Sequence, residues 1–160
     1  MTENVHACAI VLCERGLLIR GASGSGKSSL AAAMVEAYTA RGRFARLVSD
    51  DRTNVRAVNG RLVASVPEAL QGLLELRGVG IIGCRTAREA VVSLVVDLLD
   101  PSSVSRAPRP EETVTEIAGI GVERVGLSER ATPINVLLLS ALVDGAGLTA
   151  HDTPAQRRDP

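Results

Sequence analysis

Residues 21–28 read Gly21-Ala22-Ser23-Gly24-Ser25-Gly26-Lys27-Ser28 and fit the Walker A pattern G-x-x-x-x-G-K-S/T. In this pattern backbone amides curl around an anion, and glycine makes the curl sterically possible. We expect Lys27 to bridge the β- and γ-phosphate oxygens of ATP, and the Ser28 hydroxyl to ligate Mg²⁺. The stretch therefore predicts a nucleotide site, against the alternative of a glycine-rich turn capped by serine.

The segments on either side supply the context that this pattern requires. Residues 6–12 and 17–20 are apolar runs separated by Glu14-Arg15-Gly16, which predicts an antiparallel hairpin leading into the loop. Over residues 28–41 apolar side chains recur at helical spacing, and Gly42 stands where a C-terminal cap would be. A strand, the loop and a helix therefore follow one another, which favours nucleotide binding.

The rest of the chain predicts a mixed α/β fold. Asn59-Gly60 lies between the apolar runs 55–58 and 62–66 and predicts a two-residue hairpin. Further expected elements are strands at residues 44–49, 79–84 and 91–99, a short helix within 67–76 and a closing helix over 134–143.

Two segments are expected to be exposed. Prolines, serines and charges predict a loop over residues 100–113, and residues 150–160 form a polar tail that we expect to be flexible. We therefore predict a single P-loop kinase domain over residues 1–149, with a mixed β-sheet and flanking helices.

Composition excludes several classes of function. The chain is 46% hydrophobic with zero formal net charge, and Tyr38 and Phe44 are its only aromatic residues. Nucleic-acid binding is disfavoured, because such sites need basic patches and stacking aromatics. We find no apolar run of about 18 residues and no targeting segment, and expect a cytoplasmic protein.

The three cysteines, Cys8, Cys13 and Cys84, lack zinc-like spacing and lie in apolar surroundings. We expect buried free thiols and assign them no chemistry.

Asp50 and Asp51 end the apolar strand 44–49, where phosphoryl-transfer enzymes place a carboxylate that holds magnesium. Adjacent side chains of an extended strand point to different sides, so one carboxylate can face the metal while the other accepts a proton from an attacking hydroxyl. A polar turn at Asp-Asp-Arg is the alternative.

Glu75 and Arg77 place opposite charges inside the apolar run 73–82, where an unpaired charge would be costly to bury. In an extended segment the two share a face, and Gly78 and Gly80 would allow a ligand to approach. A structural ion pair is the alternative. His6, taken alone, predicts no function.

Taken together, the His6 hairpin, residues 21–28, Leu47-Val48-Ser49-Asp50-Asp51 and the segment 74–82 resemble the catalytic domain of HPr kinase/phosphorylase. The resemblance covers roughly residues 5–100 and implies a fold similar to phosphoenolpyruvate carboxykinase. It also implies phosphorylation of a serine on HPr, a small phosphocarrier of the sugar phosphotransferase system, with ATP and Mg²⁺.

The resemblance also implies residue roles. His6 matches the family's active-site histidine beside the phosphate, Lys27 its loop lysine and Asp51 its general base. Ser28 and Glu75 match its magnesium ligands, Asp50 the first of its paired aspartates and Arg77 the arginine of its glutamate-containing signature. We place Asp50 in the metal set with Ser28 and Glu75.

The chain also departs from the family. Residues 128–135 lack the family's C-terminal arginine-rich loop and leave only Arg130 as a substitute, so the resemblance supports the kinase reaction more than the reverse phosphorylase reaction. We expect a short form without the family's N-terminal domain, as in alphaproteobacteria, that assembles as a homo-oligomer, with a hexamer as the implied form.

Two further hypotheses remain open. One is a nucleotide-binding regulatory module without turnover. The other is a P-loop kinase of a small metabolite, which the antiparallel hairpin before the loop disfavours and a parallel core would favour.

Overall fold

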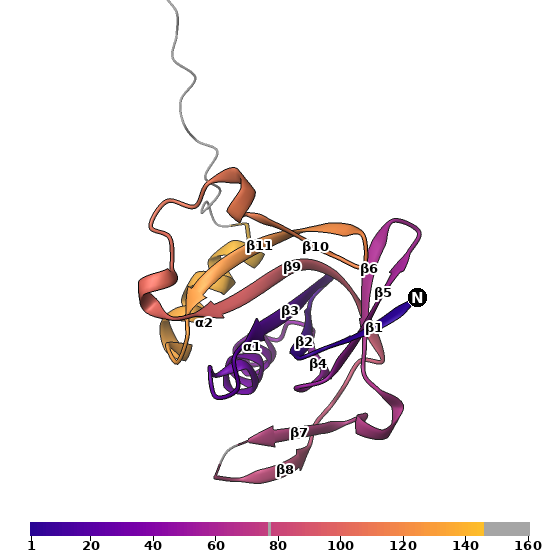
Figure 1. Cartoon of the computed structure of the whole chain (residues 1–160). Coiled ribbons are helices and arrows are strands. Elements are labelled where there is room, and N and C mark those ends of the chain that lie inside the picture. Colours follow the sequence, from indigo (N-terminus) through magenta and orange to yellow (C-terminus); the bar gives the residue numbers. More distant parts are fainter. Residues whose placement is uncertain (77, 146–160) are drawn as a thin grey trace, which may run out of the picture.

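A mixed β-sheet forms the centre of the computed structural model, which describes residues 1–76 and 78–145 (Figure 1). Among these residues nine strands form one sheet, in which β11 pairs with β9 and β10 with β11, and the other seven follow the order β1-β5-β6-β9-β3-β2-β4. The strands are β1 (Thr2–Val5), β2 (Ala7–Leu12), β3 (Arg15–Gly21), β4 (Ala45–Ser49), β5 (Thr53–Val58), β6 (Arg61–Ser65), β9 (Glu89–Leu99), β10 (Val114–Ile117) and β11 (Ile120–Ser128).

The sheet separates two apolar clusters. On one face, α1 (Lys27–Ala40) and α2 (Thr132–Val143) pack against it, with Tyr38 and Leu139 fully buried. On the other face, side chains of β5, β6, β10 and β11 enclose a second cluster around Leu18 and Val95. The central strands β3 and β9 are parallel and carry near-continuous apolar runs, as strands buried on both faces do.

Strand direction brings one end of several strands to the same edge. β2 is antiparallel to both β3 and β4, so β3 and β4 run in the same direction, and β9 and β11 are parallel to β3. The carboxyl ends of these four strands and the start of β2 therefore lie at one edge. In open α/β sheets this edge is the usual place for a ligand.

The sequence-based elements before residue 67 are confirmed. β2 and β3 form the expected hairpin, and α1 begins where the glycine-rich loop ends. Asn59 and Gly60 join β5 to β6 with φ values of 50° and 74°, as the two-residue turn requires. Gly42 has a φ of 71° and donates its N–H to Thr39 O over 2.9 Å, as expected for a helix C-terminus.

The short helix expected within residues 67–76 is largely wrong. Only Glu68–Leu70 form a single 3₁₀ turn, and Leu73–Leu76 instead form β7, which pairs with β8 (Gly80–Gly83) in a separate two-stranded sheet (Figure 1). A run too short for a stable helix gains more by pairing, because Leu74 is buried against the main core while its partner Ile82 packs beside it.

Several other elements differ from expectation. β1, β10 and β11 were not predicted, while 3₁₀ turns at Pro101–Ser103 and Pro110–Glu112 lie within the exposed loop expected at residues 100–113. The tail expected over residues 150–160 lies outside the described residues, so the boundary of the domain is untested.

Neither described helix has the length and apolar content needed to cross a membrane.

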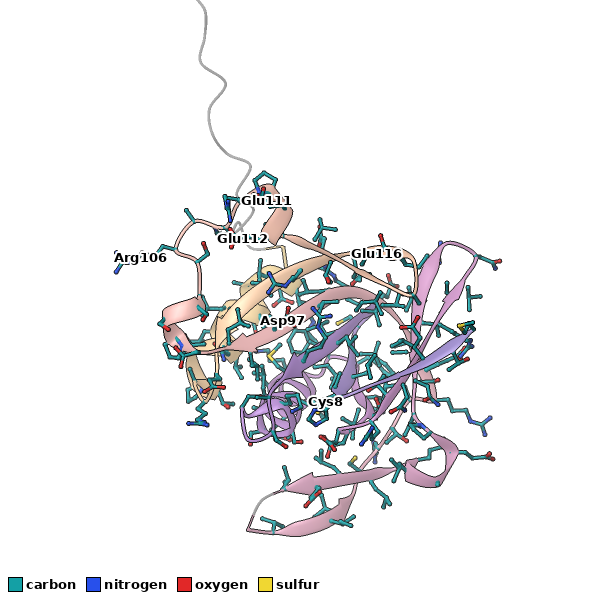
Figure 2. The ribbon with its side chains drawn as sticks, viewed as in Figure 1. Cys8, Asp97, Arg106, Glu111, Glu112 and Glu116 are labelled. Carbon is teal, nitrogen blue, oxygen red and sulfur yellow. The ribbon has the colours of Figure 1, made fainter. Side chains whose placement is uncertain are left out.

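An ion triad joins the three central strands. Arg20 on β3 donates two hydrogen bonds to Asp97 on β9, over 2.7 and 2.9 Å, and Arg124 on β11 donates a third over 2.5 Å. Figure 2 labels Asp97, which is 8% exposed. Burial alone would raise the pKa of Asp97, but the hydrogen bonds and charges of the two arginines outweigh it and hold this pKa below its usual value.

The lowered pKa predicts a pH-dependent contribution to stability. Because the folded-state pKa of Asp97 is depressed, its contribution is present above the unfolded pKa and is lost as the pH falls through the folded pKa. Asp97→Asn should therefore lower the free energy of unfolding by about 2 kcal/mol at neutral pH. The difference from the unmodified protein should shrink as the pH falls below about 4.

Urea unfolding at neutral and acidic pH measures this difference. Glu116→Gln, which changes an exposed carboxylate on β10, is the matched control and should change little at either pH. A deficit of Asp97→Asn that stays constant with pH would contradict the assigned role of the carboxylate.

Candidate functional site

The glycine-rich loop joins the carboxyl end of β3 to the first residue of α1. Gly24 and Gly26 have φ values of 78° and 98°, which side-chain-bearing residues rarely adopt. A Cβ at Gly21 would lie 2.5 Å from Ser25 Oγ and 3.2 Å from Leu98 O, so a side chain there would force its neighbours to shift. The loop therefore needs its glycines for shape, and it leads directly into the amino end of a helix, which favours anions.

Lys27 folds back over this loop. Its side chain is 5% exposed, and Nζ donates hydrogen bonds to Gly21 O over 3.0 Å and to Ala22 O over 3.1 Å. The ammonium group is therefore held inside the curl of the loop by the backbone itself. A buried cation in this position suits a phosphate group.

A cavity of about 500 Å³ opens beside the loop. Its lining combines loop residues, the acidic pair and the β7 segment: Ser23, Gly24, Gly26, Lys27, Ser28, Ser29, Asp50, Asp51, Glu75, Leu76, Arg130 and Thr132. A smaller hollow of about 360 Å³ at the β5–β6 hairpin has Arg61 as its one charged lining residue. The cavity beside the loop, where charged groups converge, is the better candidate for a binding site.

Asp50 accepts hydrogen bonds from three separate elements. The Ser28 hydroxyl on α1 donates to Oδ1 over 2.6 Å, and the Cys8 thiol on β2 donates to the same oxygen over 2.9 Å. The backbone N–H of Glu75 on β7 donates to Oδ2 over 3.0 Å. These donors fix the orientation of the carboxylate next to the loop.

Asp51 makes a separate contact, although not through the alternation expected of an extended strand, because β4 ends at Ser49. Its Oδ1 lies 2.5 Å from Nε2 of His6, which directly precedes β2. Asp51 has a φ of 60°, an uncommon conformation for a residue other than glycine and one found more often at functional sites. Asp51 lines the cavity, whereas His6 reaches it through Asp51.

The segment 74–82 is only partly described. Glu75 is exposed, lines the cavity and binds Asp50 through its backbone. Arg77 lies outside the described residues, so neither its expected role nor an ion pair with Glu75 is tested.

Arg130 lines the cavity, although the sequence motifs did not assign it to the site. Its backbone N–H donates to Ser25 O over 2.9 Å and its Nε donates to Gly24 O over 3.2 Å, so it is tied to the glycine-rich loop. The only signal in the sequence was its position within residues 128–135, where the chain differs from the family's arginine-rich loop. Thr132, which also lines the cavity, gave none.

Cys8 is the other residue whose contacts the sequence did not predict. The expectation of a buried free thiol is confirmed for Cys8, whereas Cys13 and Cys84 are only partly buried. The Cys8 side chain also bonds to Asp50. Burial raises the pKa of the Cys8 thiol to about 12, and the charge of Asp50 and the hydrogen bond to it act in the same direction. The group is therefore a protonated donor at neutral pH.

The donor set fits Mg²⁺. Within residues 1–76 and 78–145, no three His, Cys, Asp or Glu side chains are grouped closely enough to hold a metal ion by themselves. The predicted ligands are instead a hydroxyl and two carboxylates, from Ser28, Asp50 and Glu75. These are hard oxygen donors, and Mg²⁺ usually keeps several waters and takes few protein ligands beside substrate phosphates.

Known proteins are similar to this chain in sequence and in fold. The model of the HPr Serine kinase C-terminal domain matches residues 1–131. An HPr kinase/phosphorylase of Geobacillus sp. (strain WCH70) is 41% identical over 105 residues, which cover 61% of this chain and 32% of that protein. Another, from Geobacillus thermodenitrificans, is 35% identical over 139 residues, 81% of this chain and 43% of that protein.

A solved structure agrees with these matches. The Hpr(Ser) kinase/phosphatase from Coxiella burnetii superimposes with a TM-score of 0.74 at 26% identity, over 90% of each chain. The chain spans about a third to less than half of the length of the two Geobacillus relatives. Because the family model matches residues 1–131, the chain belongs to the family of the HPr Serine kinase C-terminal domain.

Proposed function

We propose that the chain is an ATP-dependent serine kinase that phosphorylates HPr and so regulates the phosphotransferase system. The observation that carries this proposal is the convergence of Lys27, Ser28, Asp50 and Asp51 on one cavity beside the glycine-rich loop. The names of the family and of the relatives support the substrate.

In this proposal residues 21–28 hold the phosphates of ATP. The loop amides and the Lys27 ammonium bind phosphate oxygens, and Arg130 adds a second positive charge at the same cavity. Ser28, Asp50 and Glu75 hold Mg²⁺, which when bound neutralises charge on the phosphates. Since Asp50 is already held beside Ser28, these two oxygen donors need little rearrangement.

Asp51 is proposed to accept the proton of the substrate serine hydroxyl. It lines the cavity and is not engaged by the donors that hold Asp50, so its carboxylate is available to a hydroxyl. His6 orients this carboxylate through the contact between Nε2 and Oδ1. Arg77 keeps its proposed role near the metal site.

Direct assay tests the proposal. Purified protein, ATP, Mg²⁺ and HPr are incubated, and mass spectrometry maps the modified residue. We expect one phosphate on a serine of HPr. Nucleotide binding without any transfer would favour the regulatory module. Transfer to a small molecule alone would favour the metabolite kinase. The parallel pairing of β3 and β11 with β9 is the observation that favours this second alternative.

Asp51→Asn should separate chemistry from binding. Without a proton acceptor, the rate of phosphate transfer to HPr should fall by about 10²–10⁴-fold. The affinity for ATP, measured by calorimetry, should stay close to that of the unmodified protein. Unchanged transfer in Asp51→Asn would remove Asp51 from the role of general base.

Lys27→Ala should weaken both binding and transfer. Loss of a buried cation that touches phosphate should reduce ATP affinity by about tenfold or more. Arg61→Ala, which removes an exposed cation from the β5–β6 hairpin, is the matched control and should leave both quantities unchanged. Equal ATP affinity in Lys27→Ala and Arg61→Ala would contradict the proposed phosphate site.

The remaining expectations stay predictions. They are a domain over residues 1–149 with a P-loop fold similar to phosphoenolpyruvate carboxykinase, a cytoplasmic location, a homo-oligomer such as a hexamer, and little reverse phosphorylase activity.

A further inference from the structure

Cys8 occupies a buried position directly behind the candidate site. β2 alternates its side chains, so Ala7 and Ala9 face the second apolar cluster while Cys8 faces α1. Figure 2 labels Cys8 in the interior of the molecule, where it is 0% exposed. Substrate and solvent cannot reach this thiol, so any influence on the site must act through its neighbours.

The two polar partners of the thiol, Asp50 and Ser28, are both predicted metal ligands. Sγ donates to Asp50 Oδ1 over 2.9 Å and lies 3.8 Å from Ser28 Oγ. Asp50 is partly buried, and a carboxylate in such surroundings is costly unless donors satisfy its oxygens. Cys8, which is fully buried and does not line the cavity, supplies one of these donors from the core.

We propose that Cys8 is a positioning residue, whose thiol holds the Asp50 carboxylate in the orientation that binds Mg²⁺ beside Ser28. This inference rests on the proposed function. The thiol does not itself touch metal, nucleotide or the reacting atoms. Its effect is to restrict the rotation of the Asp50 side chain before the metal arrives, as hydrogen-bonding neighbours of metal ligands do.

A purely apolar role for Cys8 and a positioning role predict opposite effects of Cys8→Val and Cys8→Ser. If the side chain only fills space among Ile10, Leu30 and other core residues, Cys8→Val should be tolerated and Cys8→Ser should be harmful. If it positions Asp50, Cys8→Ser keeps a donor and should behave like the unmodified protein. Cys8→Val and Cys8→Ala, which are larger and smaller but both lack a donor, should then share one defect.

The test measures binding of the non-hydrolysable analogue AMP-PNP by calorimetry at a series of Mg²⁺ concentrations. We expect Cys8→Val and Cys8→Ala to need about tenfold more Mg²⁺ for half-maximal binding, and Cys8→Ser to need an unchanged concentration. Cys84→Val is the control, because Cys84 packs against the same cluster and its thiol makes no hydrogen bond in the part of the chain that the structure describes.

Thermal melting of every variant accompanies the binding curves, and the use of two donor-free variants keeps the test valid if one fails to fold. Equal Mg²⁺ requirements in all folded variants, or a defect confined to Cys8→Ser, would overturn the positioning role while leaving the proposed function intact. Absence of Mg²⁺-dependent AMP-PNP binding in the unmodified protein would instead overturn the proposed function, and this inference with it.

Discussion

Hydrogen bonds from Ser28, Cys8 and the backbone of Glu75 converge on the carboxylate of Asp50. The donors come from α1, β2 and β7, so one side chain joins the helix after the phosphate loop, the hairpin before it and the separate β7–β8 sheet. Each donor satisfies a lone pair of a partly buried carboxylate. The arrangement of the whole candidate site depends on this interaction.

The sheet makes the convergence possible. β3, β4 and β11 end at the same edge at which β2 begins, which gathers the glycine-rich loop, the acidic pair, Arg130 and His6. The ion triad of Arg20, Asp97 and Arg124 binds the three central strands to one another behind the loop. The paired strands thus form a rigid scaffold, and the segments at its edge present the charged groups, as is common in binding sites.

Local signals predicted much of this arrangement. The loop and its flanking hairpin and helix follow from short-range patterns, because turn chemistry and helical spacing act between near neighbours. Asp50 and Asp51 were expected to differ through strand alternation, but both lie beyond β4 and Asp51 has a φ of 60°. β10 and β11 could not be predicted, since Gly119, Gly121 and Gly126 interrupt their pattern and their pairing with β9 is long-range. The contacts of Cys8 and Arg130 could not be predicted either, because their partners are far away in the sequence. Asp50 is 42 positions from Cys8, and Gly24 is 106 positions from Arg130.

Crystals grown with AMP-PNP and Mn²⁺, a substitute for Mg²⁺ with detectable anomalous scattering, test the central claim most directly. The account predicts an anomalous peak beside Ser28 Oγ and the Asp50 carboxylate, with the triphosphate inside residues 21–28. A peak that lies away from Asp50, or a triphosphate bound outside the glycine-rich loop, would contradict it.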